Sequence, residues 1–215
     1  MVVKSKDTHN VNEIDNVCIV INNEDPDQHH TGFFFKNTKD EVKFLHLAWF
    51  DHLLYEDPDE KYFWLDIPID KFNLMQMQMF LENIHNKNNQ ECSYGVALDG
   101  VSFNNDGNLL QENLHSGLTC ATFVMRALEA QGYNLINLDT WEIRKEDKIW
   151  QEKIIGALQN YWKTTPAFIE FQKNYIGKVA RYKPIEVVAA ANSEEIPLNQ
   201  DKVIELSKKL LKIIQ

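Results

Sequence analysis

The pattern of apolar and polar residues predicts strands in the first half of the chain and helices in the second. Short apolar runs rich in β-branched and aromatic residues are typical of buried strands, and the turns between them are rich in Asn, Asp and Pro. Strands are expected at 17–21, 31–35, 42–50 and 62–67, and a hairpin at 94–98 and 101–103. This order of elements favours an α+β fold.

Apolar residues that recur every three or four positions predict the helices. They are expected at 70–85, 120–132, 144–162, 167–175, 184–191 and 201–214. In the helix at 144–162, the spacing predicts that Ile149 and Trp162 are buried together with Trp150, Ile154 and Leu158. We therefore expect a disordered or loosely attached N-terminus at 1–14, a core at 15–135 and a helical extension at 136–215 packed on that core.

Composition narrows the partners that the chain can take. The 22 basic and 32 acidic residues give a net charge of −10, which repels nucleic acid and anionic lipid. The polar N-terminus does not resemble a signal peptide, and no apolar stretch is long enough for a membrane span. Three cysteines without CxxC spacing favour free thiols in the cytoplasm. Secretion without a cleaved signal stays open.

Cys120 is the strongest candidate for chemistry. It follows Thr119, a residue typical of a helix N-cap, and the helix is expected to end at Gly132. A thiol in the first helical turn meets unpaired backbone N–H groups and the positive end of the helix dipole, and both favour the nucleophilic thiolate. The alternative is a buried structural cysteine. Cys18 and Cys92 are expected to be structural.

Two histidines on neighbouring strands are candidate partners of this cysteine. His30 begins one expected strand, and His46 lies on the next, 16 residues later. A hairpin that turns near residue 38 places them roughly opposite each other, at about 4.5–5.5 Å between Cβ atoms. One imidazole can then orient the other, and Cys120 completes a Cys–His–His set.

Three alternatives to this set stay open. His29 is a second candidate base, because strand boundaries are uncertain by about two to four residues. His30 can be a turn histidine without a role, and His46 a core histidine with its hydrogen bonds satisfied. A zinc site from His29, His30, His46 and Cys120 is disfavoured, because adjacent strand residues point to opposite faces. We expect no metal or other cofactor.

The order of these pieces resembles the circularly permuted branch of the papain-like superfamily, which includes NlpC-type peptidases and lecithin:retinol acyltransferase. In that branch the histidine strand comes first, a polar residue follows on the next strand, and the cysteine opens a later helix. The resemblance covers residues 15–132. It is carried by the lead strand at 17–21, His30-Thr31-Gly32-Phe33-Phe34, Phe44-Leu45-His46-Leu47 and Leu118-Thr119-Cys120-Ala121-Thr122-Phe123-Val124.

The resemblance implies Cys120 as nucleophile, His30 as base and His46 as third polar residue. It implies a thiol protease or a related hydrolase that cleaves an amide, ester or thioester of a peptide, acyl or small-molecule substrate. The oxyanion hole would include the Cys120 backbone N–H, and Tyr94 is a candidate side-chain donor. Acyl transfer is an alternative outcome. The long stretch from 46 to 120 and the helices after 132 indicate a specialised substrate or a protein-partner surface. A papain-like fold without catalysis, serving interaction or assembly, is the competing interpretation.

Overall fold

The computed structural model describes residues 1–23 and 28–215 of the chain. Within these residues, five antiparallel strands form the main sheet in the order β4-β3-β2-β1-β5. The α+β class is therefore as predicted. The strands of this sheet are β1 (Val17–Asn22), β2 (Thr31–Lys36), β3 (Val42–Trp49), β4 (His52–Glu56) and β5 (Tyr62–Asp66).

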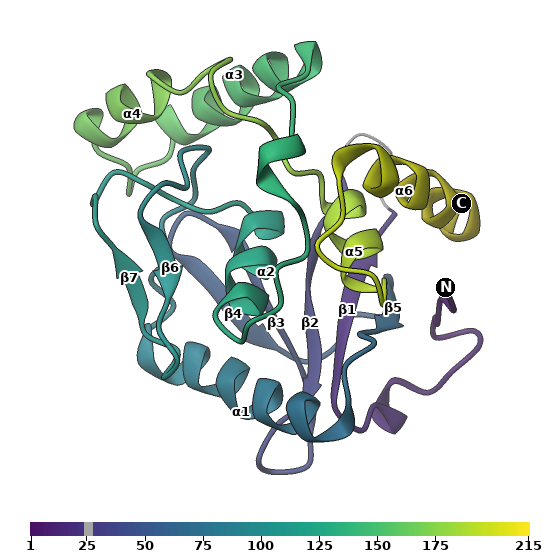
Figure 1. The fold of residues 1–215 in the computed structure, drawn as a ribbon. Coiled ribbons are helices and arrows are strands. Elements are labelled where there is room, and N and C mark those ends of the chain that lie inside the picture. Colours follow the sequence, from purple (N-terminus) through teal and green to yellow (C-terminus); the bar gives the residue numbers. More distant parts are fainter. Residues whose placement is uncertain (24–27) are drawn as a thin grey trace.

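The helices lie around this sheet (Figure 1). In that view α1 crosses one end of the strands, α3 and α4 lie together at the opposite end, and α5 and α6 lie beside β1 and β5. None of the helices in the described residues combines the length and apolar character that crossing a membrane requires. The helices are α1 (Lys71–Lys87), α2 (Cys120–Glu129), α3 (Lys145–Gln159), α4 (Pro166–Lys173), α5 (Pro184–Ala191) and α6 (Gln200–Ile214).

Both faces of the sheet are buried, which explains why its strands are apolar without interruption. Phe33 and Leu45 face the main core, where they join Phe123 of α2 and Val188 of α5. On the opposite face Phe34 belongs to a smaller cluster with Cys18, Val20, Phe44, Tyr62 and Trp64. Successive residues of a strand therefore serve two separate cores.

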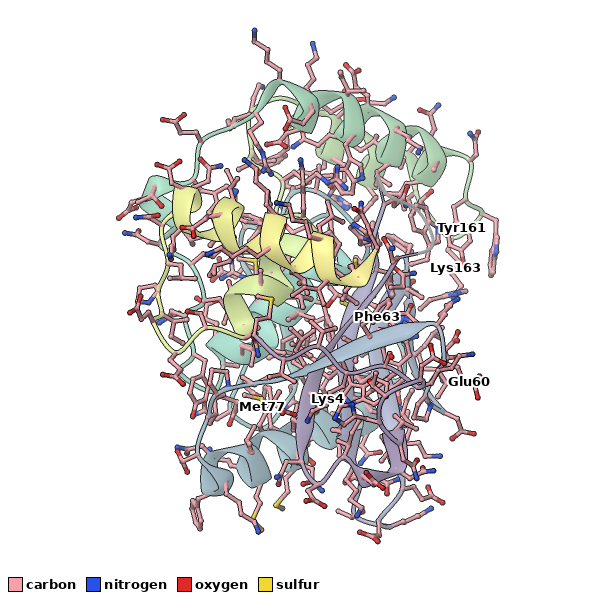
Figure 2. All side chains as sticks on the ribbon, turned by 90° about the vertical axis from the view of Figure 1, so that its right-hand side faces the viewer. Lys4, Glu60, Phe63, Met77, Tyr161 and Lys163 are labelled. Atoms are coloured by element: carbon pink, nitrogen blue, oxygen red, sulfur yellow. The ribbon has the colours of Figure 1, made fainter. Side chains whose placement is uncertain are left out.

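The start of the chain lies along the free edge of β5. Lys4 N donates to Trp64 O, and Trp64 N donates to Lys4 O, both at 2.9 Å. The ammonium of Lys4 also pairs with Asp66 at 2.6 Å. Figure 2 shows Lys4 beside this strand. The segment predicted to be loosely attached thus holds a backbone contact with the sheet.

The predicted hairpin at 94–98 and 101–103 is wrong in its first strand. Val101–Phe103 (β6) pairs with Leu109–Gln111 (β7) instead. The turn between them uses Gly107, whose φ of 87° favours glycine. Tyr94 forms an isolated bridge with Leu118, so the chain at Tyr94 lies beside the segment that leads into α2.

Two residues that were predicted to be buried on the apolar face of α3 are exposed. Trp162 is 81% exposed and Ile149 is 68% exposed, whereas Ile154 and Leu158 are buried. The reason for Trp162 is that α3 ends at Gln159, so the helical spacing does not continue to residue 162. Ile149 lies on the exposed face of α3, where it lines a groove rather than a core.

Candidate active site

Helix α2 begins at Cys120 because the two residues that flank it in the first turn cap the helix. Thr119 Oγ1 accepts from the backbone N–H of Thr122, and Thr122 Oγ1 accepts from that of Thr119. This reciprocal capping box fixes the helix start. The predicted N-cap is thus confirmed, and Cys120 is 5% exposed at the start of α2.

Burial dominates the electrostatics of this sulfur. It raises the pKa of the Cys120 thiol to about 11, although hydrogen bonds from the backbone N–H groups of Thr31 and Ala121 lower that pKa in part. The expected effect of the helix start is therefore present but is outweighed. The prediction of a resting thiolate is wrong. Cys120 rests as a thiol among donors that stabilise the thiolate once its proton leaves.

Cys120 lines a cavity of about 80 Å³, which we call the Cys120 cavity. The sheet contributes His30 and Trp49 to its wall, and the chain before α2 contributes Tyr94. The opposite wall includes Trp150 of α3 and Arg181, which precedes α5. The cavity therefore lies between the part of the chain up to residue 135 and the helices that follow it.

A chain of hydrogen bonds joins His30, which directly precedes β2, to His46 on β3 and Glu56 on β4. Nε2 of His30 lies 2.7 Å from Nδ1 of His46, and Nε2 of His46 lies 3.0 Å from Oε1 of Glu56. The strand register pairs Phe33 with Leu45, so His46 faces Gly32 and lies diagonally from His30. The predicted register is thus two residues off, but both histidines keep the same face and reach each other.

The carboxylate of Glu56 determines the tautomers of both rings, because it can only accept a hydrogen bond. His46 then carries its proton on Nε2 and accepts at Nδ1. His30 must donate from Nε2, which leaves the lone pair on its Nδ1. Burial lowers the pKa of His30 to about 3, with a further contribution from His46. Burial likewise lowers the pKa of His46 to about 4. Both rings are therefore neutral at pH 7.

Cys120 and His30 reach the same cavity from opposite sides of the sheet. His46 stacks on Phe44 in the smaller core, whereas α2 packs on the main core. Cys120 and His30 both line the cavity near the start of β2, because His30 directly precedes Thr31, whose backbone N–H lowers the pKa of the Cys120 thiol. In the described part of the chain no hydrogen bond joins Cys120 Sγ to an imidazole. The structure thus joins His30 to His46 and brings His30 and Cys120 to one cavity.

Two other sequence candidates line the same cavity. His29 Nδ1 donates to Asn22 O at 2.8 Å, which commits that proton to the backbone. Burial raises the pKa of Tyr94 well above its ordinary value, and proximity to the Cys120 sulfur adds to this, so the phenol keeps its proton. The backbone N–H of Cys120 lies within hydrogen-bond reach of the Tyr94 hydroxyl. Both groups are hydrogen-bond donors beside the sulfur, the kind of group that an oxyanion hole requires.

Glu56 and Arg181 are two site residues that the sequence patterns did not predict. Strand β4, which carries Glu56, follows a turn in which Asp51 adopts a φ of 50°, a conformation that is uncommon outside glycine. The alternation in His52-Leu53-Leu54-Tyr55-Glu56 was the available signal. Arg181 lies between α4 and α5, in a segment without periodicity.

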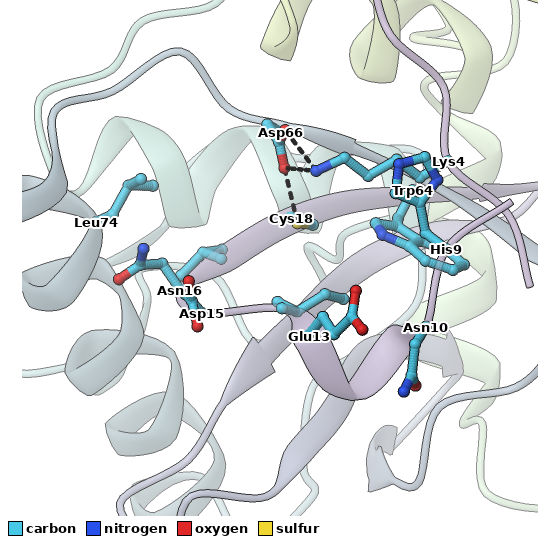
Figure 3. A pocket seen from close by; sticks show the side chains of 12 residues that line it. Lys4, His9, Asn10, Glu13, Asp15, Asn16, Cys18, Trp64, Asp66 and Leu74 are labelled. Atoms are coloured by element: carbon cyan, nitrogen blue, oxygen red, sulfur yellow. Dashed lines mark hydrogen bonds and ion pairs between the residues drawn. The ribbon is translucent and has the colours of Figure 1, made fainter.

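The other two cysteines occupy different environments. Cys18 Sγ donates to Asp66 Oδ1 at 3.4 Å, beside the Lys4–Asp66 ion pair, in a separate cavity of about 320 Å³ (Figure 3). Burial raises the pKa of Cys18, and the Asp66 charge raises it further. Burial, with a contribution from Asp51, raises the pKa of Cys92 to about 12. Neither thiol receives the backbone donors that surround Cys120.

Comparisons with protein-family models, with curated proteins and with solved structures return no match. Within residues 1–23 and 28–215, no group of three or more His, Cys, Asp or Glu side chains is placed to hold a metal ion. Any function for this chain must therefore be argued from the geometry of the Cys120 cavity.

Proposed function

We propose that this chain is a cysteine-dependent hydrolase of the permuted papain-like type that forms an acyl-enzyme on Cys120. The observation that carries the proposal is the hydrogen-bond chain from Glu56 through His46 to His30. It leaves His30 Nδ1 as a lone-pair acceptor on a residue that shares a cavity with a cysteine. A general base requires an oriented lone pair, and this relay orients the one on His30.

In the first half of the reaction, His30 Nδ1 takes the thiol proton as Cys120 Sγ attacks the substrate carbonyl. The Cys120 N–H and the Tyr94 hydroxyl donate to the oxyanion of the tetrahedral intermediate. His46 and Glu56 stabilise the imidazolium that forms. Collapse of the intermediate breaks the bond to the leaving group, which receives the proton from His30. The acyl group is then held as a thioester on Cys120.

In the second half, His30 accepts a proton from water, and the resulting hydroxide attacks the thioester. The carboxylic acid product leaves, and the sulfur regains its proton from His30. Because both imidazoles and the thiol rest neutral, the enzyme works by general-base catalysis rather than from a preformed ion pair. An amine or alcohol in place of water gives acyl transfer by the same steps.

The proposed substrate is an amide, ester or thioester of a peptide or small molecule, and the proposed location is the cytoplasm. The three free thiols support a reducing compartment. The net charge of −10 argues against nucleic acid as partner. The helical extension, which closes one wall of the Cys120 cavity, is the proposed surface for any protein partner.

The test uses p-nitrophenyl acetate, followed by mass spectrometry of the intact chain and peptide mapping. We expect one acetyl group on Cys120, which is lost in Cys120→Ala and kept in the matched control Cys92→Ala. His30→Ala should slow acetylation by about 10²–10⁴-fold, the range of a lost general base. Equal labelling of Cys18 and Cys120, or an unchanged rate in His30→Ala, would overturn the proposal.

A papain-like fold that serves interaction or assembly without catalysis is the second candidate. The observation that favours it is that burial keeps the Cys120 thiol protonated, with no hydrogen bond to an imidazole among the described residues. Under this alternative Cys120 forms no thioester with any activated ester, and Cys120→Ser leaves the biological effect intact. The acetylation experiment therefore separates the two candidates.

A further inference from the structure

Arg181 is a partly buried cation whose side chain has no hydrogen-bond partner in the described residues. Its guanidinium carbon lies 4.2 Å above the centre of the Trp150 ring, which covers one face of the group. Arg181 Nε is buried without a partner, and so is the neighbouring indole Nε1 of Trp150. Both residues line the Cys120 cavity. Two unsatisfied donors in one cavity wall call for an acceptor from outside the chain.

The nearby carboxylates of Asp147 and Glu186 do not supply this acceptor, because both form ion pairs with Arg144. Arg144 Nε donates to Asp147 Oδ1 at 3.3 Å, and its Nη1 pairs with Glu186. Oδ2 of Asp147 accepts the backbone N–H of Arg181 at 3.1 Å, not its guanidinium. Burial lowers the pKa of Arg181 while Tyr94, Asp147 and Glu186 raise it, and the group stays charged.

Removing part of a cation from water without a hydrogen-bonded partner is costly, and stacking on an indole offsets only part of that cost. An incoming anion would supply the missing partner. Among the Arg181 nitrogens, only Nε is both enclosed and without a hydrogen bond. The two terminal nitrogens also have no hydrogen-bond partner among the described residues, so they must keep accessible surface. Because Arg181 lines the cavity, these nitrogens are the donors that a ligand in it can meet.

The surroundings of the cavity are also basic. It adjoins a groove of about 640 Å³, with which it shares Trp150 and Arg181. Lys153 and Lys208 line this groove and form no ion pair with any described residue. Glu146 and Glu186 lie in the same wall, but they pair with Lys183 and Arg144. On a chain of net charge −10, this local positive field concentrates anions beside the cavity.

We propose that Arg181 binds an oxyanion of the substrate, a carboxylate or a phosphate, next to the carbonyl that Cys120 attacks. This inference rests on the proposed hydrolase function and names its substrate class, an acyl compound with an anionic group near the scissile bond. The planar guanidinium donates to two oxygens of such a group at once, which fixes the orientation of the neighbouring carbonyl. The groove then receives the remainder of the substrate.

The test compares alkylation of Cys120 by iodoacetate and by iodoacetamide, which share a leaving group and differ in charge. Rates are measured by peptide mapping at pH 9 for the wild type, Arg181→Gln and Arg181→Lys. We expect Arg181→Gln to lower the iodoacetate rate about tenfold relative to the iodoacetamide rate, the loss of one charged hydrogen bond. Arg181→Lys should keep most of the preference, because it retains the charge.

Lys39→Gln is the matched control, because it removes the same charge at the turn between β2 and β3, far along β2 from His30. Its iodoacetate-to-iodoacetamide ratio should equal that of the wild type. Misfolding of Arg181→Gln would show as alkylation of the buried Cys18 and Cys92. In that case the decision rests on Arg181→Lys and on protection of the wild type by added anions.

Protection of Cys120 from alkylation by added anions shows whether the site prefers a carboxylate or a phosphate. Propionate or inorganic phosphate should slow alkylation of the wild type by iodoacetate, and the one that protects at lower concentration identifies the group. An unchanged ratio in Arg181→Gln, or absence of protection by both anions, overturns the role of Arg181 and leaves the hydrolase proposal intact. If instead acetylation of Cys120 is independent of His30, the hydrolase proposal fails even where Arg181 still selects iodoacetate.

Discussion

Gly32 offers the sharpest test of the packing that holds the histidine pair. A Cβ added at Gly32 would lie 2.6 Å from His46 Cβ, 2.6 Å from Leu45 O and 2.8 Å from Phe44 Cε2. Ordinary carbon contacts are about 3.5–4.0 Å. Two of these atoms belong to the backbone or to a Cβ, so relief requires strands β2 and β3 to separate. Gly32→Ala should therefore both destabilise the fold and displace His46.

The expected cost follows from overpacking of a buried site. Inserting a methyl group into a filled core costs about 1–3 kcal/mol. In a chain of this size, each kcal/mol lowers the melting temperature by about 2–4 °C. The displaced His46 also lengthens the 2.7 Å contact with His30, so acetylation of Cys120 should fall beyond the effect on stability.

Gly156→Ala is the control, because it makes the same chemical change with the opposite expectation. Gly156 lies in the interior of α3, and an added Cβ there meets nothing within 4 Å. Alanine should stabilise the helix by about 0.8–1.0 kcal/mol. Urea unfolding followed by far-ultraviolet circular dichroism measures both variants. If Gly32→Ala is as stable as the wild type, His46 does not lie opposite Gly32.

Three further outcomes are expected. In His46→Gln, which keeps an acceptor for His30, Cys120 should be acetylated within about tenfold of the wild-type rate. In His46→Leu, the rate should fall on the order of 10²–10⁴-fold. Equal rates in the two variants would show that His46 is not part of the relay. Gln172→Leu should lower the free energy of unfolding by at least about 2 kcal/mol in urea, because Gln172 satisfies the backbone N–H of Val96 at 2.7 Å and the backbone oxygen of His115 at 2.6 Å. The folded-state pKa values of about 3 for His30 and about 4 for His46 lie below the ordinary 6.5, so stability should be full above pH 6.5 and fall with pH below it, by about 2 kcal/mol per imidazole at pH 5. Urea midpoints at pH 7.5 and 5 check this, and a loss as large in His30→Gln would contradict it.

The elements predicted best are those with local signals. The apolar run at 17–21 and the three phenylalanines at 33–35 indicate buried strands whatever surrounds them. Thr119 caps α2 as expected, because a threonine side chain satisfies N–H groups within its own turn. The contact between His30 and His46 also follows locally, since a short hairpin brings its two strands together even when the register differs by two residues.

The features that were missed depend on contacts far apart in the sequence. Strand β4 requires Asp51 to adopt a left-handed conformation, which alternation alone does not reveal. The protonation of Cys120 depends on how completely distant elements enclose it, and a helix start predicts only the opposing effect. Arg181 gains its place from Trp150 on α3, and no spacing along the chain connects these two residues.

The pairing of Lys4 with Trp64 has a consequence for the behaviour of the protein in concentrated solution. An open β-strand at the border of a sheet is a template on which a second molecule can add its own strand. The backbone bonds of Lys4 occupy that template at β5, and its ammonium adds a charge there. A chain shortened past Lys4 would expose the template, and we expect it to self-associate while its interior stays unchanged.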